Sequence, residues 1–153
     1  MAAPLYFAYG SNLWLDQMAR RCPGSTFVGI AALKDWKWFI NTRGYANVIP
    51  SPGDVVHGMV YALTPANEMS LDRYEGFPYS YVKQMHKVEM NGSMVDALVY
   101  VDVARQQEGK INEEYIARMN CGILDGLEKG LPEWYFEKYL KPVIPHSADA
   151  GNK

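Results

Sequence analysis

Two groups of residues could carry chemistry, and the first is a polar turn, Tyr9-Gly10-Ser11-Asn12-Leu13. An apolar, aromatic run precedes it, which is typical of a half-buried strand. We expect Gly10 to adopt a positive φ, a conformation closed to most other residues. Ser11 and Asn12 are good caps for a helix over residues 13–20. A strand that ends at a helix N-terminus directs backbone N–H groups into one small volume, where an anion or a developing oxyanion can bind.

This turn is not a common phosphate loop, because it has no second glycine at dinucleotide spacing and no Gly-Lys-Ser/Thr sequence follows it. A small carboxylate or a polarised carbonyl is therefore a better ligand for it than a nucleotide. The alternative is an ordinary connection between a strand and a helix. The residues of the turn alone leave both interpretations open.

The second group centres on Glu75, in the last turn of a short predicted helix that ends at Gly76. The helix dipole presents its negative end there. Aromatic neighbours would also desolvate the carboxylate: Tyr74, Phe77, Tyr79 and Tyr81. Both effects raise the pKa of a carboxyl group toward neutrality, where it can take and return a proton. Taken alone, Glu75 is better explained as a solvated surface residue.

Composition excludes several classes of function. The net charge is −2 and no basic block is present, so nucleic-acid binding has no electrostatic footprint. No apolar run approaches the length of a membrane span, and no signal segment is apparent. The 2 cysteines and 3 histidines have no metal or redox spacing. We expect a soluble cytoplasmic protein, monomer or homodimer, with a small-molecule substrate, no metal and no cofactor.

The chain of 153 residues suits one domain with one core. We assign residues 1–145 to this domain and residues 146–153 to a flexible C-terminal tail. Strands are predicted over residues 5–9, 27–33, 36–41, 55–63, 81–89 and 94–101. The pair Asn91-Gly92 predicts a hairpin between the last two strands, and residues 50–54 predict a turn before the fourth strand.

Three helices are predicted over residues 65–75, 112–129 and 132–140. Thr64 and Pro65 are a typical N-cap and first helical residue for the first of them. The second has apolar residues at helical spacing. Many strands with few helices, and no regular alternation of the two, predict an α+β domain. Its centre would be a small mixed β-barrel or a strongly curled sheet, flanked by helices.

Together, the two groups of residues resemble the γ-glutamyl cyclotransferase-like family, which includes the plant AIG2-like proteins and many fungal members. The marks of this family are a Tyr-Gly-Ser-Asn-Leu loop, here residues 9–13, and a Leu-Asp-x-x-Glu-Gly segment, here residues 71–76. The similarity continues through residues 51–58 and 130–135, so it covers most of the chain. Residues 115–120 look most like fungal members.

The resemblance implies a fold built around a small β-barrel and the conversion of a γ-glutamyl amide to 5-oxoproline and a free amine. It implies that Glu75 is the general acid and base, and that one glutamate serves both proton transfers without metal or cofactor. Backbone N–H groups of the turn would hold substrate oxygens. The family places a tyrosine soon after the glutamate, for which Tyr81 is the best match and Tyr115 a second candidate. The predicted substrate-binding set is Tyr9, Gly10, Ser11, Asn12, Leu13, Tyr81 and Tyr115.

Two other functions remain open. A cyclase or isomerase of secondary metabolism could use the same scaffold and the same glutamate. Aromatic residues bear on this alternative, since any that lined the pocket would suit an apolar leaving group: Trp36, Trp38, Phe39 and Tyr45. We expect at least half of these four to pack in the core. The other alternative is a binding protein without turnover, which would have little reason to keep a desolvated carboxylate.

Overall fold

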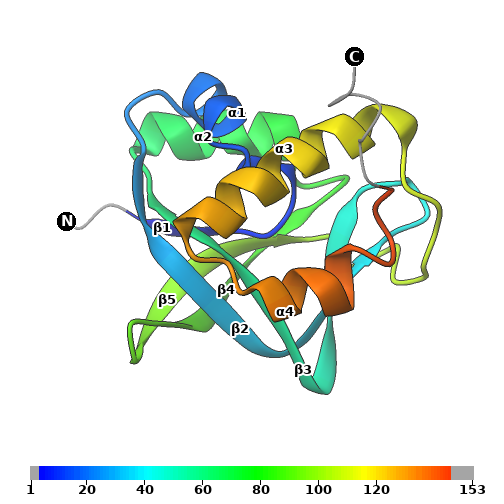
Figure 1. Cartoon of the computed structure of the whole chain (residues 1–153). Coiled ribbons are helices and arrows are strands. Elements are labelled where there is room, and N and C mark those ends of the chain that lie inside the picture. The colour runs from blue at the N-terminus through cyan, green and yellow to red at the C-terminus, as the bar shows by residue number, and fades with distance from the viewer. Residues whose placement is uncertain (1–3, 146–153) are drawn as a thin grey trace.

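The computed structural model describes residues 4–145, and five strands within it close into a barrel (Figure 1). They are β1 (Leu5–Ala8), β2 (Thr26–Ile40), β3 (Ala46–Ala62), β4 (Val82–Met90) and β5 (Ser93–Val101). Their order around the barrel is β1-β3-β2-β4-β5. Neighbouring strands are antiparallel except β1 and β5, which run parallel with Tyr6 opposite Leu98. The predicted mixed barrel is thus confirmed.

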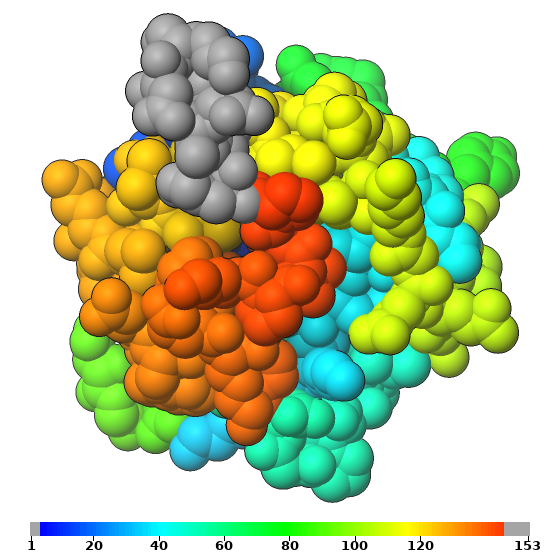
Figure 2. Space-filling model, turned by 45° about the vertical axis from the view of Figure 1, so that its right-hand side comes forward, coloured from blue at the N-terminus to red at the C-terminus, as the bar shows by residue number. Residues whose placement is uncertain are grey.

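Helices cover one end and one side of the barrel (Figure 1). They are the 3₁₀ turn η1 (Ser11–Leu13), α1 (Leu15–Arg21), α2 (Pro65–Glu75), α3 (Glu113–Lys129), α4 (Glu133–Tyr135) and the π-helical η2 (Phe136–Leu140). Helix α1 packs on α2, and α3 packs on η1. Figure 2 shows the C-terminal segment, in orange and red, lying against the barrel beside β3. There the Tyr139 hydroxyl donates a hydrogen bond to Asp54 of β3 (2.6 Å).

Strand β1 is held between two clusters of buried side chains. Successive side chains of a strand point to opposite faces. Phe7 therefore joins a cluster that includes Met119 of α3, while Tyr6 joins another that includes Leu71 of α2. Phe7 is fully buried, and a buried side chain of this size contributes roughly 1.5–3 kcal/mol to folding. Both clusters thus fix the strand at the point where the polar turn begins.

The helix boundaries follow the local sequence signals closely. Thr64 and Asn67 form a reciprocal capping box at the start of α2, and Gly76, at φ 67°, ends it as predicted. Asn112 caps α3, which ends at Lys129. The hairpin between β4 and β5 turns at residues 91–92, as expected. The predicted tail, residues 146–153, lies outside the described residues.

Two predictions, a break between two strands and a turn before a third, are wrong in the same part of the barrel. Residues 27–33 and 36–41 belong to one strand, β2, and residues 50–54 lie inside β3 rather than before it. Ladder pairing shifts register at Asp35, whose φ is 67° and whose carboxylate accepts the N–H of Gly53 (3.0 Å). The predicted break between residues 33 and 36 and the predicted turn over residues 50–54 lie opposite each other in the paired strands. Together they form a β-bulge within one continuous hairpin.

Candidate active site

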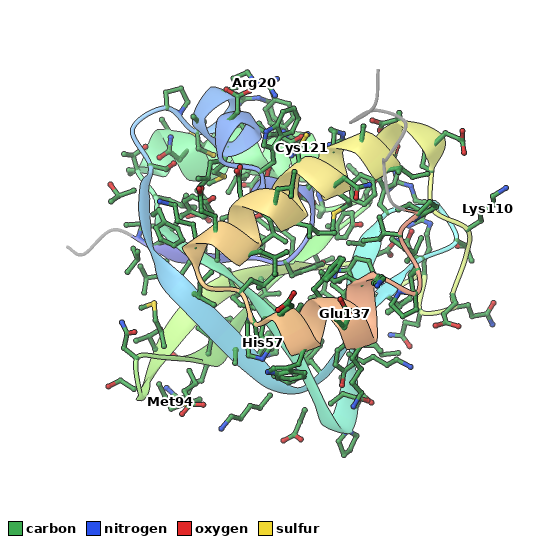
Figure 3. All side chains as sticks on the ribbon, viewed as in Figure 1. Arg20, His57, Met94, Lys110, Cys121 and Glu137 are labelled. Carbon is green, nitrogen blue, oxygen red and sulfur yellow. The ribbon has the colours of Figure 1, made fainter. Side chains whose placement is uncertain are left out.

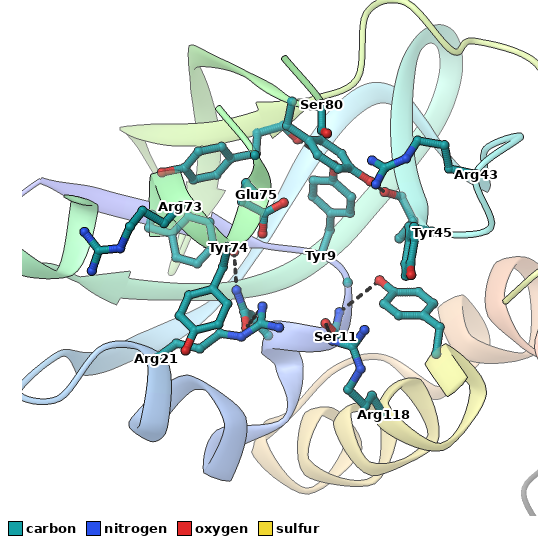
Figure 4. A pocket seen from close by; sticks show the side chains of 18 residues that line it. Tyr9, Ser11, Arg21, Arg43, Tyr45, Arg73, Tyr74, Glu75, Ser80 and Arg118 are labelled. Atoms are coloured by element: carbon teal, nitrogen blue, oxygen red, sulfur yellow. Dashed lines mark hydrogen bonds between the residues drawn. The ribbon is translucent and has the colours of Figure 1, made fainter. Parts of the chain in front are cut away.

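A cavity of about 300 Å³ lies at the end of the barrel that carries the helices (Figure 4). Its walls come from the turn after β1, the loop between β2 and β3, the end of α2 with the residues after it, and the first turns of α3. Its volume is in the range of small-molecule sites. It brings together all but one of the predicted site residues: Tyr9, Gly10, Ser11, Asn12, Glu75, Tyr81 and Tyr115.

Leu13 is the predicted residue that does not line this cavity. Its side chain is buried in the core at 1% exposure. It packs against α3, where a Cβ on Gly122 would lie 3.0 Å from the Leu13 Cβ. A leucine at this position therefore anchors the turn to the core from behind instead of meeting a ligand.

The predicted backbone of the turn is wrong in two respects. Gly10 has a φ of −116°, not a positive one. Residues 11–13 form the 3₁₀ turn η1, and α1 begins only at Leu15, so Ser11 and Asn12 do not cap α1. The N–H of Leu15 instead donates to the Asp125 carboxylate of α3 (2.8 Å). A helix cap supplied from a distant element has no local sequence signal.

Close packing, rather than a positive φ, explains the glycine at position 10. A Cβ there would lie 2.7 Å from the hydroxyl oxygen of Tyr115 and 3.2 Å from the Cβ of Ala46. The same hydroxyl accepts the N–H of Ser11 (3.2 Å). The missing side chain thus lets α3 approach the turn closely enough to bind its backbone.

A buried polar network holds the two side chains of the turn. The Gln17 amide donates to Ser11 Oγ (2.8 Å) and to Asn12 Oδ1 (2.9 Å), and Gln17 is only 3% exposed. Asn12 Nδ2 donates to the Tyr6 hydroxyl (3.0 Å), while Arg118 donates to Ser11 Oγ (3.2 Å). Because the side chains are fully engaged, the turn is preorganised before any ligand arrives.

Glu75 lies at the C-terminal end of α2, and its carboxyl group faces into the cavity (Figure 4). Burial raises its pKa to about 7, against a weaker opposing effect of Arg21, Arg118 and Arg43. Among the described residues, none forms a hydrogen bond with this carboxylate. The group is therefore desolvated, free of protein partners in residues 4–145, and poised to exchange a proton near neutral pH.

The neighbours that desolvate Glu75 differ from most of those predicted. Tyr74 and Tyr79 are 58% and 91% exposed, so they turn away from the core. Of the predicted aromatic neighbours, Tyr81 is the buried one. The wall consists instead of tyrosines from the barrel strands, the start of α3 and their connections: Tyr6, Tyr9, Tyr81, Tyr100 and Tyr115. Apart from Tyr81, these residues lie far from Glu75 in sequence, so the sequence around Glu75 does not identify them as its neighbours.

Two of these tyrosines are pinned by backbone carbonyl groups. The Tyr9 hydroxyl donates to the carbonyl of Tyr100 (2.5 Å), and the Tyr81 hydroxyl donates to the carbonyl of Ala46 (2.7 Å). Burial raises the pKa of both phenols well above the usual value, so both stay neutral. Their rings form part of the cavity wall and exclude water from it without adding a charge.

Four arginines line the cavity, and sequence analysis overlooked all of them: Arg21, Arg43, Arg73 and Arg118. Arg118 follows Tyr115 by three residues, so the two share one face of α3, and that spacing is a usable signal. Arg43 comes from a loop and has no such signal. Among residues 4–145, no group of three or more His, Cys, Asp or Glu residues could hold a metal ion.

The aromatic residues of β2 and the following loop mostly pack in the core, as expected. Trp38 and Phe39 are buried, at 2% and 4% exposure. The Trp36 ring packs edge-on against His86, with the ring centres 4.7 Å apart. Tyr45 lines the cavity beside Tyr115. Its neighbour there is Arg43, so this wall is polar rather than apolar.

Comparison with known proteins identifies the family of this chain. Residues 6–117 match the family described as gamma-glutamyl cyclotransferase, AIG2-like. The chain is 33% identical to mouse gamma-glutamylcyclotransferase and 31% identical to the human protein of that name, in each case over 93% of this chain and 79% of the relative. A solved structure of a gamma-glutamyl cyclotransferase superimposes with a TM-score of 0.82 at 31% identity, covering 94% of this chain and 89% of that one. No helix among the described residues is long and apolar enough to cross a membrane. The chain belongs to the gamma-glutamyl cyclotransferase, AIG2-like family.

Proposed function

We propose that this protein is a γ-glutamyl cyclotransferase that converts a small γ-glutamyl amide to 5-oxoproline and a free amine. One observation carries the proposal: the Glu75 carboxyl group, with a pKa of about 7, faces the same cavity as the turn over residues 9–12. The names of the mouse and human relatives support it.

The reaction needs one group that first removes and then returns a proton. The carboxylate of Glu75 takes a proton from the α-ammonium group of the substrate. The freed amine attacks the γ-carbonyl carbon, and the new C–N bond closes a five-membered ring. When the original amide C–N bond breaks, the Glu75 carboxylic acid gives its proton to the leaving nitrogen. The ring nitrogen then loses its second proton to the regenerated Glu75 carboxylate, which passes it to the released amine, so the products are the neutral lactam and an ammonium ion. Both transfers fit a carboxyl group whose pKa is near 7.

The turn and Tyr115 would stabilise the negative charge that develops on the γ-carbonyl oxygen. Backbone groups of Ser11 and Ala46 lie at the Tyr115 oxygen and lower its pKa, although burial keeps the value at about 12. The phenol therefore keeps its own proton at neutral pH. With backbone N–H groups on its oxygen, that proton is available to a substrate oxygen in the cavity.

Four finer expectations remain predictions from the sequence alone. They are the likeness of residues 115–120 to fungal members, a role in secondary metabolism, a cytoplasmic location, and a monomer or homodimer. A specialised ring-forming or isomerising reaction would use the same Glu75. No specific observation in the cavity favours that reaction over cyclotransfer.

The experiment is incubation of the purified protein with a panel of γ-glutamyl compounds, scored by mass spectrometry for 5-oxoproline. The panel holds γ-glutamyl amino acids, γ-glutamyl amines and glutathione, with the matching α-glutamyl peptides as controls. We expect 5-oxoproline from at least one γ-glutamyl compound and none above background from the α-linked controls. No product from any member of the panel would contradict the proposal.

A further inference from the structure

We propose that Arg43 makes this enzyme selective for γ-glutamyl substrates whose leaving amine carries a carboxylate. This inference rests on the proposed function and adds to it the residue that binds the leaving amine of the substrate. It comes from the charges that line the cavity, from their order around Glu75, and from the way the loop of Arg43 is built.

The cavity has more positive charge than a γ-glutamyl group can neutralise. Of the described residues that line it, four are arginines and Glu75 is the one acid. Arg118 is paired with Glu114 (2.8 Å), and the guanidinium of Arg73 points away from Glu75 in Figure 4. Within residues 4–145, neither Arg21 nor Arg43 forms a salt bridge.

Two guanidinium groups therefore remain for the substrate. The γ-glutamyl group carries one ammonium, which faces Glu75, and one α-carboxylate, which can neutralise one arginine. A second anion is needed for the other arginine, and the leaving amine is the part of the substrate that can supply it. A guanidinium recognises a carboxylate well, because its N–H groups match the two oxygens.

The positions of the two arginines decide which carboxylate each one meets. Arg21 opposes the pKa rise of Glu75 most strongly of the three arginines that act on it, and Arg43 least. Arg21 also donates to Asn12 Oδ1 of the turn (3.4 Å). The α-ammonium and α-carboxylate share one carbon, so the α-carboxylate must lie close to Glu75. Arg21 thus suits the α-carboxylate and leaves Arg43 to the leaving amine. Figure 4 shows the two entering from opposite sides.

The loop that carries Arg43 is held as a fixed support. The buried Asn41 side chain accepts the N–H groups of Arg43 (3.0 Å) and Tyr45 (3.2 Å) and donates to Asp102 (2.9 Å). Gly44 has a φ of 95°, and a Cβ there would lie 2.8 Å from the backbone nitrogen of Asn112. The Arg43 guanidinium stands 5.4 Å from the Tyr45 ring centre, which limits its motion further. A cation so placed can bind a carboxylate with little loss of entropy.

The test compares two substrates that differ by one charge. Initial rates are measured with γ-glutamyl-alanine, whose leaving amine has a free carboxylate, and with γ-glutamyl-alaninamide, whose leaving amine has none. We expect the wild type to prefer the acid. We expect Arg43→Gln to lose about tenfold to a hundredfold in kcat/KM on the acid, the size expected for one charged hydrogen bond, and to stay within about twofold on the amide.

Two further variants make the result specific to the placed guanidinium. Lys110→Gln removes the same charge from the neighbouring loop, and Figure 3 shows its side chain pointing outward, so both rates should stay unchanged. Arg43→Lys keeps the charge without the planar fork and should retain part of the preference for the acid.

Equal wild-type rates on both substrates, or an Arg43→Gln loss of the same size on both, would overturn the role of Arg43. Either result would leave the cyclotransferase activity standing, because 5-oxoproline would still form. Absence of 5-oxoproline from both substrates and from the wider panel would instead refute the proposed function. The melting temperature of each variant, measured alongside, separates a change in specificity from a loss of fold.

Discussion

Glu75 ends α2 with its carboxyl group in a cavity walled by tyrosines, and burial there raises its pKa to about 7. At that pKa the carboxylate and the carboxylic acid are both populated near neutral pH. For such a base, the free-energy cost of accepting a proton and the cost of returning that proton are both small. The position of Glu75 in the cavity and its raised pKa thus point to the same role.

The activity should follow the ionisation of Glu75. The carboxylate is the form that accepts the substrate proton, so kcat/KM should rise with pH and reach half its maximum near pH 7. Arg21→Gln is the diagnostic variant, because the positive charge of Arg21 lowers the pKa of Glu75. Its loss should move the midpoint to higher pH. A wild-type profile that is flat from pH 5.5 to 8.5 would contradict this assignment.

The stability of the fold should report the same group. The pKa of Glu75 is raised from 4.5 to about 7 by folding, so the stabilising contribution is complete below pH 4.5 and is lost as the pH rises toward 7. The Glu75→Gln side chain cannot ionise, so the variant avoids the free-energy cost of ionising a buried carboxyl group. Relative to wild type, the variant should gain stability as the pH rises from 4.5 to 7, reaching a gain on the order of 1–3 kcal/mol at higher pH. Urea unfolding at pH 4.5 and 8.5 measures it, and an equal difference at both pH values would contradict it.

At the scale of elements, the turn after β1 is positioned by its neighbours more than by its own residues. Gln17 of α1 and Arg118 of α3 hold its side chains, and the Tyr115 hydroxyl accepts one of its backbone N–H groups. The site is therefore the place where α1, α3 and β1 meet. Small changes in the packing of these elements should act on activity directly.

Gly10→Ala tests that packing. Its Cβ would meet the Tyr115 hydroxyl oxygen at 2.7 Å, so the turn and α3 must separate. We expect a loss of about 1–3 kcal/mol in stability, as for other overpacked sites, and a loss of turnover. Adding Tyr115→Phe removes the clashing oxygen and should restore the melting temperature but not the turnover. Full activity in Gly10→Ala would show that the turn is only a connector.

Local signals explain why some elements were predictable and others were not. The bounds of α2 follow from Thr64, Pro65 and Gly76, which act within one or two turns of the chain. The merging of two predicted strands into β2 depends on pairing with β3 across the barrel, and so does the bulge at Asp35. Local β-propensity cannot show that pairing with β3 continues β2 through the predicted break.

At the scale of the molecule, the barrel and the opposition of Glu75 to the turn over residues 9–12 were predictable because each is marked by a short motif. Tyr9, Tyr81 and Tyr115 were also predicted as site residues. Tyr6, Tyr100 and the four arginines were not, because the fold gathers them from strands β1 and β5, helices α1, α2 and α3, and the loop between β2 and β3. Their charge and desolvation arise only when those elements meet. Arg43 makes the wall beside Tyr45 polar, so this wall does not supply the apolar surface that would suit an apolar leaving group.

The complete enzyme should need no metal or nucleotide. The nucleophile and the electrophile are both parts of the substrate, and Glu75 balances the protons, so the reaction consumes no co-reactant. The sequence also has no cluster of metal ligands at the usual spacings. Turnover should be unchanged after exhaustive treatment with EDTA and dialysis. Loss of activity that a divalent ion restores would contradict this prediction.

The most direct test of the account compares the rate of 5-oxoproline formation by the wild type and by Glu75→Gln on the best γ-glutamyl substrate. The amide keeps the size of the side chain but cannot accept the proton. We predict that the folded variant is slower by about 10²–10⁴-fold, the usual loss for a missing general base. A folded Glu75→Gln protein that forms 5-oxoproline at nearly the wild-type rate would remove Glu75 from the mechanism and contradict the central claim.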